Sequence, residues 1–305
     1  MPISDRLISI LIPTYQAESS LGALLNILKC QRLERFEIIV VDSSSTDRTT
    51  EIAKSFGVQT YVIPKDEFDH GGTRTYLGKL ANGDVLVYLT QDAIPVHDAT
   101  VPILVSALMA DERTGAAFGR QIPHENATPF AKHLREFNYP IASWERSFQD
   151  RARYGIKTLF CSNSFAAYKR TALEAVGWFK DGLLMGEDMH ACAKMLKQGF
   201  RIKYVAEAAV FHSHNYSVRQ EFKRYFDLGA FFRKERWILQ EYGSAEGEGL
   251  RFIRSELSFL IRSGLPHYVP LSLVRILAKG AGFRLGQVSP YLPGKIVRWA
   301  SMHSK

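Results

Sequence analysis

Short, largely apolar runs alternate with amphipathic segments along the first third of the 305-residue chain. Runs of this length, without regular polar alternation, are typical of strands that are buried on both faces of a sheet. They lie at residues 7–12, 36–41, 58–63 and 85–89. Helices are predicted between them, around residues 21–28, 46–56 and 73–81. Strands that alternate with helices across short connections predict an α/β fold with a mostly parallel sheet and flanking helices.

The pattern is less regular in the second third of the chain. Residues 123–157 are rich in aromatic side chains, which fits either an irregular insertion or helices around an aromatic core. Beyond them we predict three strands and one helix, at residues 159–168, 201–205, 208–211 and 187–197. The remainder is predicted to be mostly helical. The chain therefore divides into an α/β domain over residues 1–215 and a helical extension over residues 216–305.

Positive charge is concentrated in this helical extension. The chain has a net charge of +8, and residues 221–305 carry 14 Lys or Arg against 7 Asp or Glu. Such asymmetry indicates an anionic partner, either a membrane surface or a phosphate-bearing acceptor, or else a solvated basic surface. Residues 251–263 combine large apolar residues with three arginines, as in an amphipathic helix. That helix is expected either to lie on an anionic membrane or to pack on the preceding domain.

Cysteine usage and the N-terminal sequence bear on location. The three cysteines, Cys30, Cys161 and Cys192, are odd in number and have no metal-ligand spacing, which indicates a reducing compartment. No signal-peptide pattern and no run of 18 apolar residues occurs in the chain. We therefore expect a cytoplasmic protein, located at the inner face of the plasma membrane if the basic extension binds lipid.

Acidic and histidine side chains gather at the ends of the predicted strands and at the start of one helix. They are Asp42, Asp92, Glu187, Asp188, His212 and His214. Because ligands bind at the carboxyl edge of an open α/β sheet, we expect these side chains to converge there. Carboxylate and imidazole ligands suit Mg²⁺ or Mn²⁺. The group is typical of a metal-assisted transferase that acts on a diphosphate-linked substrate.

The segments that carry these residues resemble the family-2 inverting glycosyltransferases of GT-A fold, over roughly residues 7–214. The likeness is carried by Ile-Leu-Ile-Pro-Thr-Tyr at 10–15 and Glu-Ile-Ile-Val-Val-Asp-Ser-Ser-Ser-Thr-Asp at 37–47. It implies a Rossmann-like sheet, with a nucleotide-binding half over about 1–120 and an acceptor-binding half over about 121–215. The resemblance assigns Pro13, Thr14, Tyr15, Asp42 and Ser44 to the nucleotide sugar, with Asp42 accepting a pyrimidine N3–H.

A narrower likeness lies in Phe-Asp-His-Gly-Gly-Thr-Arg at residues 68–74. It is similar to the Phe-x-His-Gly-x-x-Arg signature of bacterial rhamnosyltransferases that use dTDP-rhamnose, a group that also has paired histidines like those at 212 and 214. His70 and Arg74 would then bind the diphosphate or the deoxysugar, and the glycines would allow a turn close to the ligand. We expect Arg74→Ala to reduce turnover severely while leaving the fold intact.

The resemblance also implies roles for the remaining residues. Asp92 is the expected metal ligand, His212 the second and His214 a third. The metal loop of the family usually reads Asp-x-Asp, whereas Thr90-Gln91-Asp92 has one carboxylate, and Gln91 is expected beside the nucleotide sugar. An inverting transfer needs a base to take the proton of the acceptor hydroxyl. Asp188 matches that base, and Glu187 would orient the acceptor or cap the turn.

These features predict an inverting glycosyltransferase that moves L-rhamnose from dTDP-L-rhamnose to a saccharide or lipid-linked acceptor in bacterial O-antigen or capsule synthesis. Two alternatives stay open: a family-2 transferase with a UDP-hexose donor, and a catalytically inactive sugar-nucleotide-binding scaffold. A processive synthase is disfavoured, because residues 233–237 lack the Gln-x-x-Arg-Trp motif and no spanning segment is present. No recognised nucleic-acid-binding motif accompanies the basic extension, so no nucleic-acid partner is expected.

Overall fold

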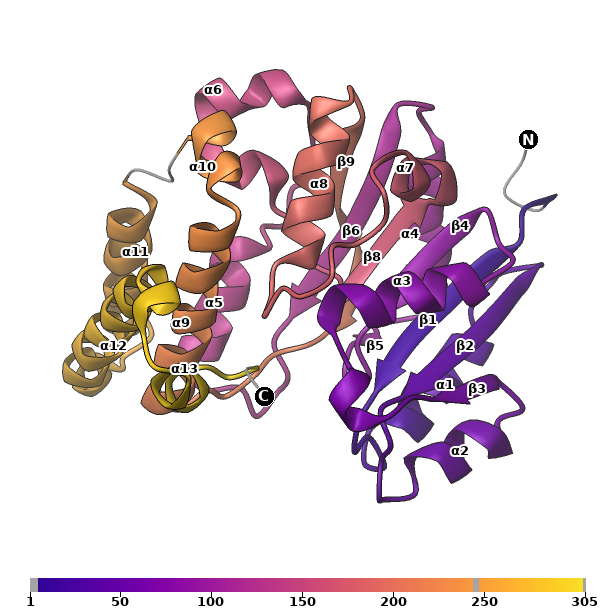
Figure 1. Cartoon of the computed structure of the whole chain (residues 1–305), viewed down its shortest axis with the longest axis horizontal. Coiled ribbons are helices and arrows are strands. Elements are labelled where there is room, and N and C mark those ends of the chain that lie inside the picture. Colours follow the sequence, from indigo (N-terminus) through magenta and orange to yellow (C-terminus); the bar gives the residue numbers. More distant parts are fainter. Residues whose placement is uncertain (1–4, 244–246, 304–305) are drawn as a thin grey trace.

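The computed structural model describes residues 5–243 and 247–303. In this part of the chain the strands form one nine-stranded sheet with the order β3-β2-β1-β4-β8-β6-β9-β5, and β7 pairs with β9 (Figure 1). The strands are β1 (Ile8–Thr14), β2 (Phe36–Asp42), β3 (Gln59–Val62), β4 (Val85–Leu89), β5 (Ile94–Pro95), β6 (Thr114–Ile122), β7 (Trp144–Arg146), β8 (Phe165–Lys169) and β9 (Arg201–Phe211).

Helices cover both faces of the sheet and enclose two apolar cores. Helices α3, α7 and α8 pack on one face, around Leu77, Tyr168 and Leu196. Helices α1, α2 and α4 pack on the other, around Leu25 and Leu104. The helices are α1 (Leu21–Lys29), α2 (Thr49–Ser55), α3 (His70–Leu80), α4 (Thr100–Met109), α5 (Pro129–Asn138), α6 (Arg151–Tyr154), α7 (Arg170–Ala175), α8 (Glu187–Lys197), α9 (Val218–Lys234), α10 (Arg236–Tyr242), α11 (Glu248–Arg262), α12 (Val269–Gln287) and α13 (Gly294–Ala300).

Strand direction determines what meets at the carboxyl edge of the sheet. Strands β1 to β4 are parallel to one another, as the sequence predicts. Strand β8 runs antiparallel to β4 and β6, so it begins where they end, with Phe165 opposite Leu89. The loop before β8 therefore lies at the carboxyl edge, where the backbone N–H of Thr90 donates to the carbonyl of Ser164 at 3.2 Å.

Several predicted boundaries were wrong. The predicted strand at 159–168 begins only at Phe165, and residues 160–164 form a loop. The two strands predicted at 201–205 and 208–211 are one strand, β9, with a register irregularity opposite Gly119 and Arg120. Strand β6 and helix α4 were not predicted at all. Strand β6 has few β-branched residues, which removes the usual composition signal.

The aromatic-rich segment at 123–157 contains short elements around an aromatic core, which is the second of the two alternatives. Trp144 on β7 packs edge-on against Phe118 of β6, with ring centroids 5.5 Å apart. Phe160 contacts the same ring at 5.6 Å, and Tyr139 contacts Phe160. This cluster packs α5 and β7 against β6, next to the loop that precedes β8.

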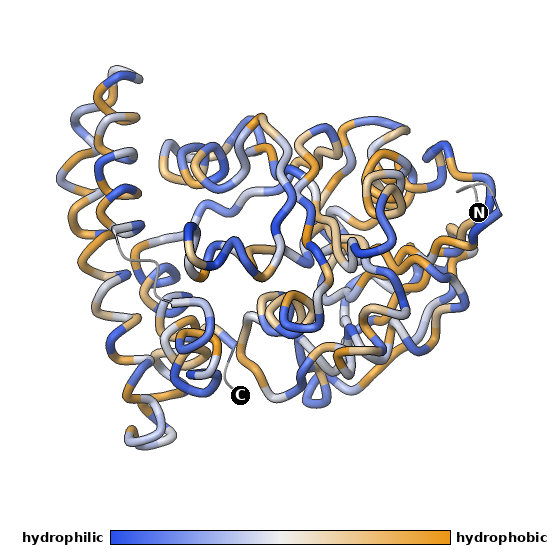
Figure 2. Tube along the Cα trace, turned by 90° about the horizontal axis from the view of Figure 1, so that it is seen from above, coloured by the Kyte–Doolittle hydropathy of each residue, from blue (hydrophilic) through white to orange (hydrophobic). Residues whose placement is uncertain are grey.

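Helix α12 lies at the outer edge of the molecule (Figure 1), and two of its basic side chains face α9. Arg275 donates to the carboxylate of Glu221 on α9 at 2.8 Å, and Lys279 lies 3.4 Å from the same oxygen. Leu273, Val274 and Leu277 are exposed on its other side, and Figure 2 shows many hydrophobic residues along this outlying helical layer. Within the described residues, no helix combines the length and apolar character needed to cross a bilayer.

Candidate active site

A cavity of about 720 Å³ opens at the carboxyl edge of the sheet. Its walls come from the loops after β1 and β4, the loop before β8, the N-terminus of α8, and helices α5 and α9. The lining contains these predicted site residues: Pro13, Thr14, Tyr15, His70, Arg74, Gln91, Asp92, Glu187, Asp188, His212 and His214. Asp42 and Ser44 are the two that do not line it. The convergence expected from strand order is therefore present for all but these two.

Asp92, His212 and His214 form a compact group on one wall of the cavity. Their candidate ligand atoms lie within 4.8 Å of one another. The Nε2 atom of His212 is 3.5 Å from Asp92 Oδ1, and the Nδ1 atom of His214 is 3.8 Å from Asp92 Oδ2. One carboxylate and two imidazoles are a donor set that suits a divalent transition metal such as Mn²⁺.

The hydrogen bond to Gln121 orients His212 for such a role. Gln121 lies on β6 beside β9, and its Oε1 atom is 2.9 Å from His212 Nδ1. The amide nitrogen of Gln121 donates to Ser162 Oγ, which leaves Oε1 as the acceptor. Nδ1 of His212 then carries the hydrogen, and the lone pair on Nε2 points towards Asp92. Burial lowers the pKa of His212, assisted by the nearby Arg135, and so keeps the ring neutral.

The side chain of Gln91 links the loop after β4 to the loop after β1. Its Oε1 accepts from the backbone N–H of Tyr15 at 2.8 Å, and its Nε2 donates to the carbonyl of Tyr15 at 3.0 Å. A carboxylate at this position could accept the first hydrogen bond but could not donate the second. Gln91, the middle residue of the metal loop, therefore fixes the position of the loop after β1, whereas the carboxylate missing from the Asp-x-Asp pattern is the one at residue 90.

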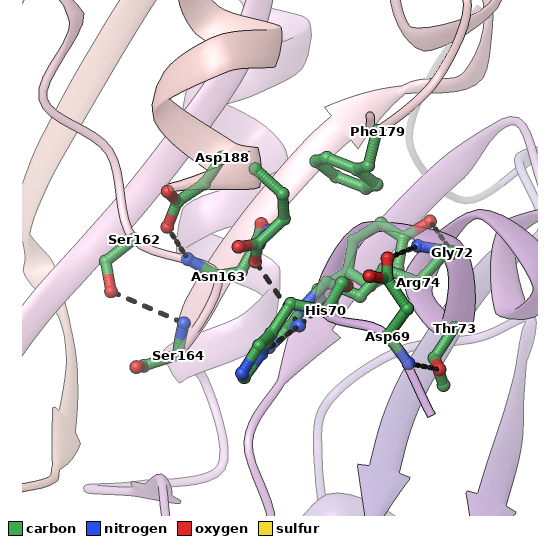
Figure 3. Close-up of polar contacts among 12 residues, drawn as sticks. Asp69, His70, Gly72, Thr73, Arg74, Ser162, Asn163, Ser164, Phe179 and Asp188 are labelled. Atoms are coloured by element: carbon green, nitrogen blue, oxygen red, sulfur yellow. Dashed lines mark hydrogen bonds and ion pairs between the residues drawn. The ribbon is translucent and has the colours of Figure 1, made fainter. Parts of the chain in front are cut away.

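Asp188 lies at the first turn of α8, beside the loop that precedes β8 (Figure 3). Gly186, with a φ of +83°, lets the chain enter this helix in the left-handed conformation. The carboxylate of Asp188 accepts from the backbone N–H groups of Asn163 at 3.1 Å and Met189 at 2.7 Å. Burial and the adjacent Glu187 carboxylate raise the pKa of Asp188 to about 7. A carboxylate with a pKa near neutrality is suited to general base chemistry.

The carboxylate of Glu187 forms a buried ion pair with Arg74. Its Oε1 lies 3.3 Å from Arg74 Nη1 and accepts from Asn163 Nδ2 at 3.1 Å. Burial opposes ionisation of Glu187, but Arg74 and His70 outweigh it and lower the pKa. Tyr168 donates to Asn163 Oδ1 at 2.8 Å, which fixes the amide between the two carboxylates. Glu187 is thus held in an ion pair, where the sequence had suggested an acceptor contact or a cap.

The signature at residues 68–74 begins helix α3. Asp69 caps the helix by accepting from Gly72 N–H at 2.7 Å, and His70 is the first helical residue (Figure 3). A Cβ on Gly71 would lie 1.9 Å from the carbonyl oxygen of Lys180. Gly71 lies in the first turn of the helix, where it permits close packing on a backbone segment, instead of in the separate turn that the sequence suggested.

Asp42 and Ser44 organise the loop after β2. The carboxylate of Asp42 is fully buried and accepts from Thr14 Oγ1 at 3.0 Å and from Ser45 N–H at 2.7 Å. Ser44 is exposed and donates to the carbonyl of Ile63 at 2.8 Å. Neither side chain is among those that line the cavity, and their contacts to a nucleotide stay a prediction.

Sequence reasoning missed five residues that line or support the cavity: Gln121, Arg135, Asn163, Arg224 and His303. Arg135 on α5 and Arg224 on α9 form no ion pair with a carboxylate within residues 5–243 and 247–303. Burial, and then the neighbouring Arg224, lower the pKa of Arg135 although Asp92 acts in the opposite direction. Arginines on helices are common, so only the tertiary arrangement reveals that both face the same cavity.

Comparison with known proteins identifies the family. The sequence matches the model of glycosyl transferase family 2 over residues 9–177 and that of glycosyl transferase family group 2 over residues 96–285. The mannosyltransferase PcManGT from Pyrobaculum calidifontis, solved with GDP-Man and Mn²⁺, superposes with a TM-score of 0.64 at 16% identity, covering 92% of this chain and 87% of that one. For S. aureus TarS 1–349 the TM-score is 0.53 at 15% identity, with 93% and 91% covered. The chain therefore belongs to glycosyl transferase family 2 and is a glycosyltransferase of GT-A fold.

Its similarity to curated relatives is more specific. It is 41% identical over 298 residues to the O-antigen chain rhamnosyltransferase RfbN of Salmonella typhimurium, covering 97% of this chain and 94% of that protein. It is also 41% identical over 297 residues to the O-antigen chain rhamnosyltransferase WbaN of Salmonella anatum, with the same coverage. The predicted family and its rhamnosyltransferase-like character are confirmed.

Proposed function

We propose that this glycosyltransferase transfers L-rhamnose from dTDP-L-rhamnose, with inversion, to a saccharide acceptor in O-antigen synthesis. Support comes from the two rhamnosyltransferases at 41% identity and from the signature at residues 68–74. The observation that carries the proposal is the position of Asp188. Its carboxylate lines the same cavity as Asp92, His212 and His214, and it has a pKa near 7. A base and a diphosphate site in one cavity are what glycosyl transfer requires.

In the proposed reaction Asp188 takes the proton of the acceptor hydroxyl. The hydroxyl oxygen forms a bond to the anomeric carbon of rhamnose while the bond from that carbon to the diphosphate oxygen breaks. The nucleoside diphosphate leaves from the opposite face with the bonding electrons. Asp188 needs to be ionised before the reaction, so a pKa near 7 leaves much of it competent at neutral pH and basic enough to accept a proton.

A divalent cation, Mg²⁺ or Mn²⁺, would be held by Asp92, His212 and His214. When bound, it would neutralise charge on the leaving diphosphate. Arg135 and Arg224 line the same cavity and supply two fixed positive charges without a carboxylate partner among the described residues. The two guanidinium groups can donate charge-assisted hydrogen bonds to a diphosphate, beside a metal loop that supplies a single carboxylate.

The donor nucleotide is assigned to the half of the cavity formed by residues 1–120, with the acceptor in the half formed by 121–215. Pro13, Thr14 and Tyr15 line the cavity on the first side. Asp42 would act there through Thr14, whose hydroxyl it accepts. His70 and Arg74 would lie beside the sugar, with Arg74 acting through its ion pair with Glu187.

We also propose that residues 216–305 contact an anionic membrane surface through α12, which would bring the enzyme to a lipid-linked acceptor at the inner face of the plasma membrane. Leu273, Val274 and Leu277 form an exposed apolar face, and the extension is strongly basic. Anionic lipid complements both features. Association of two copies through this face would instead bring two basic regions together.

The test is release of nucleoside diphosphate from dTDP-L-rhamnose, UDP-glucose, UDP-galactose and GDP-mannose, with Mn²⁺, Mg²⁺ or EDTA. We expect metal-dependent release from dTDP-L-rhamnose, and loss of release in Asp188→Asn. Release from a UDP-sugar alone would keep the enzyme class and reject rhamnose as the donor sugar. If sugar nucleotides were bound but none was hydrolysed, the alternative of an inactive sugar-nucleotide-binding scaffold would replace the proposal.

A further inference from the structure

The chain after α13 turns back towards the middle of the molecule (Figure 1), and His303 lines the cavity of the candidate active site. Residues 301–303 are attached to α9 through Asp227, which is fully buried. Its carboxylate accepts from Ser301 Oγ at 2.5 Å and from the backbone N–H of Met302 at 2.9 Å. Lys223 donates to the carbonyl of Ser301 at 3.0 Å. Both family models end at or before residue 285, so residues 301–303 lie outside the matched part of the chain, whereas Lys223 and Asp227 lie inside the second match.

The attachment places the imidazole of His303 against His70. The Nδ1 atom of His303 is 3.3 Å from His70 Nε2, and the two rings meet edge-to-face with centroids 4.7 Å apart. His303 lines the cavity together with Glu187, Asp188 and Arg224. A residue 233 positions away in sequence from His70 thus contributes directly to the cavity wall.

The direction of the hydrogen bonds follows from Arg74. A guanidinium can only donate, and Arg74 Nη1 lies 3.4 Å from His70 Nδ1, so this nitrogen is the acceptor. The neutral ring then carries its hydrogen on Nε2 and donates to His303 Nδ1. His303 in turn carries its hydrogen on Nε2. Burial lowers the pKa of His70 to about 4 and also lowers that of His303, so both rings are neutral near pH 7.

We propose that His303 binds a hydroxyl of the transferred sugar through its Nε2–H, and that His70 holds the ring in the tautomer that donates. The inference rests on the proposed function, since it names a contact to the sugar of the same donor. A neutral N–H donor suits a hydroxyl, whereas the cationic Arg135 and Arg224 suit the diphosphate. The same cavity thus separates recognition of the sugar from recognition of the diphosphate by charge.

The proposal predicts a loss of affinity that depends on the sugar. We would measure the Kd of dTDP-L-rhamnose and of dTDP, both with Mn²⁺, for the wild type and for His303→Ala. The variant should bind dTDP-L-rhamnose about three- to tenfold more weakly, the range expected for one hydrogen bond to a neutral donor. Binding of dTDP should change less than about twofold. An equal loss for both ligands, or no loss for either, would overturn the assignment.

Three further variants separate hydrogen bonding from packing. His303→Phe keeps a ring but no hydrogen bond and should behave like His303→Ala. His303→Asn can accept from His70 and still donate, so it should recover much of the affinity. Met302→Ala alters the neighbouring side chain and should bind both ligands like the wild type. Full affinity in His303→Phe would show that the ring only packs, and would contradict the proposal.

A mutant cycle with His70 tests the tautomer argument. Because His70 fixes the ring of His303, the effect of His303→Ala should be much smaller in a His70→Ala background. Additive losses would reject that coupling. An increased KM for the acceptor with unchanged donor binding would move His303 to the acceptor and refute the donor contact. If the donor panel identified another sugar nucleotide, the proposed donor would fail, and the same comparison would use that sugar nucleotide and its nucleoside diphosphate.

Discussion

Asp188 is a carboxylate whose surroundings favour the protonated form. Burial and the neighbouring Glu187 raise its pKa to about 7, against the opposing hydrogen bonds from two backbone N–H groups. If Asp188 is the base, kcat/KM should rise with pH through about 7 and then level off, because only the ionised form accepts a proton. Asp188→Asn should remove turnover. A rate that is flat between pH 5 and 8 would argue against this role.

The same raised pKa has a consequence for stability. A carboxylate with a higher pKa in the folded than in the unfolded state stabilises the fold at low pH, and this contribution is lost as pH rises through the folded pKa. Asp188→Asn removes the cost of ionisation. We therefore expect its Tm to exceed that of the wild type at pH 8, on the order of a few degrees, with a smaller advantage at pH 5 and none below the unfolded pKa of about 4. Thermal melts at both pH values provide the test, and a lower Tm at pH 8 would contradict it.

The structure changes the expected effect of Arg74→Ala on stability. The sequence suggested that Arg74→Ala would leave the fold intact, but Arg74 and Glu187 form an ion pair in which both side chains are 7% exposed. Removing the arginine leaves a buried carboxylate without its cation, which costs on the order of 3 kcal/mol. Urea unfolding should show this loss, and Arg74→Ala combined with Glu187→Gln should recover part of it. Wild-type stability in Arg74→Ala would restore the original expectation.

At the scale of elements, strand β6 supports His212, a candidate metal ligand that directly follows β9. The hydrogen bond from His212 Nδ1 to Gln121 Oε1 selects the tautomer whose Nε2 faces Asp92. Gln121→Leu should therefore weaken Mn²⁺ binding about tenfold, as loss of a hydrogen-bond partner behind a ligand often does. Titration with Mn²⁺ measures this effect, and circular dichroism checks that the fold is retained. An unchanged Mn²⁺ affinity would show that Gln121 does not support metal binding by His212.

Helices α5 and α9 each contribute one arginine to the cavity wall. Arg135→Ala and Arg224→Ala should each weaken binding of inorganic pyrophosphate with Mn²⁺ by more than about tenfold, because each loses a charge-assisted hydrogen bond. Arg219→Ala is a matched control, since Arg219 is exposed on α9 and does not line the cavity. Calorimetric titration would measure all three. Equal pyrophosphate affinities for the Arg224 and Arg219 variants would show that Arg224 does not bind the diphosphate.

Elements were predictable from the sequence where burial alone determines them. Strands β1, β2 and β4 are apolar runs with no competing interpretation, and each delivers the residue that follows it to one edge of the sheet. Strand β6 was missed because it reads Thr-Gly-Ala-Ala-Phe-Gly and packs by small side chains. The loop at 160–164 was predicted as strand because it begins with apolar residues. These residues are buried in the aromatic cluster and not in the sheet.

The site was predictable to the same extent. Asp92 and His212 follow strong strands, and Asp188 begins a helix, so chain order alone could bring them together. Gln121, Asn163 and His303 act through neighbours that are distant in sequence. No local pattern encodes such a contact, because it depends on which strands pair and on how the helices pack. Asp42, which the sequence did single out, makes its hydrogen bonds within the protein, to Thr14 and Ser45.

At the scale of the whole molecule, helix α12 turns two basic side chains inward and an apolar face outward. Arg275 and Lys279 of α12 face the buried Glu221, whereas its leucines face outward. Helix α11, which the sequence had suggested for membrane contact, packs through Phe252 on His133 of α5, with ring centroids 5.0 Å apart. The alternative of packing on the catalytic domain is therefore the one found for this helix, and the membrane proposal moves to α12.

This arrangement makes the membrane proposal specific to one face. Leu277 is 72% exposed at the centre of the apolar face, so Leu277→Glu should repel an anionic bilayer and lower co-flotation with anionic vesicles at low salt. Leu250→Glu adds the same charge at a leucine of α11 that is 52% exposed, and it should float like the wild type. Donor hydrolysis in solution should be unaffected in both, because neither side chain lines the cavity. Equal flotation of the two variants would exclude α12 as the contact, and no flotation of the wild type would exclude the membrane itself.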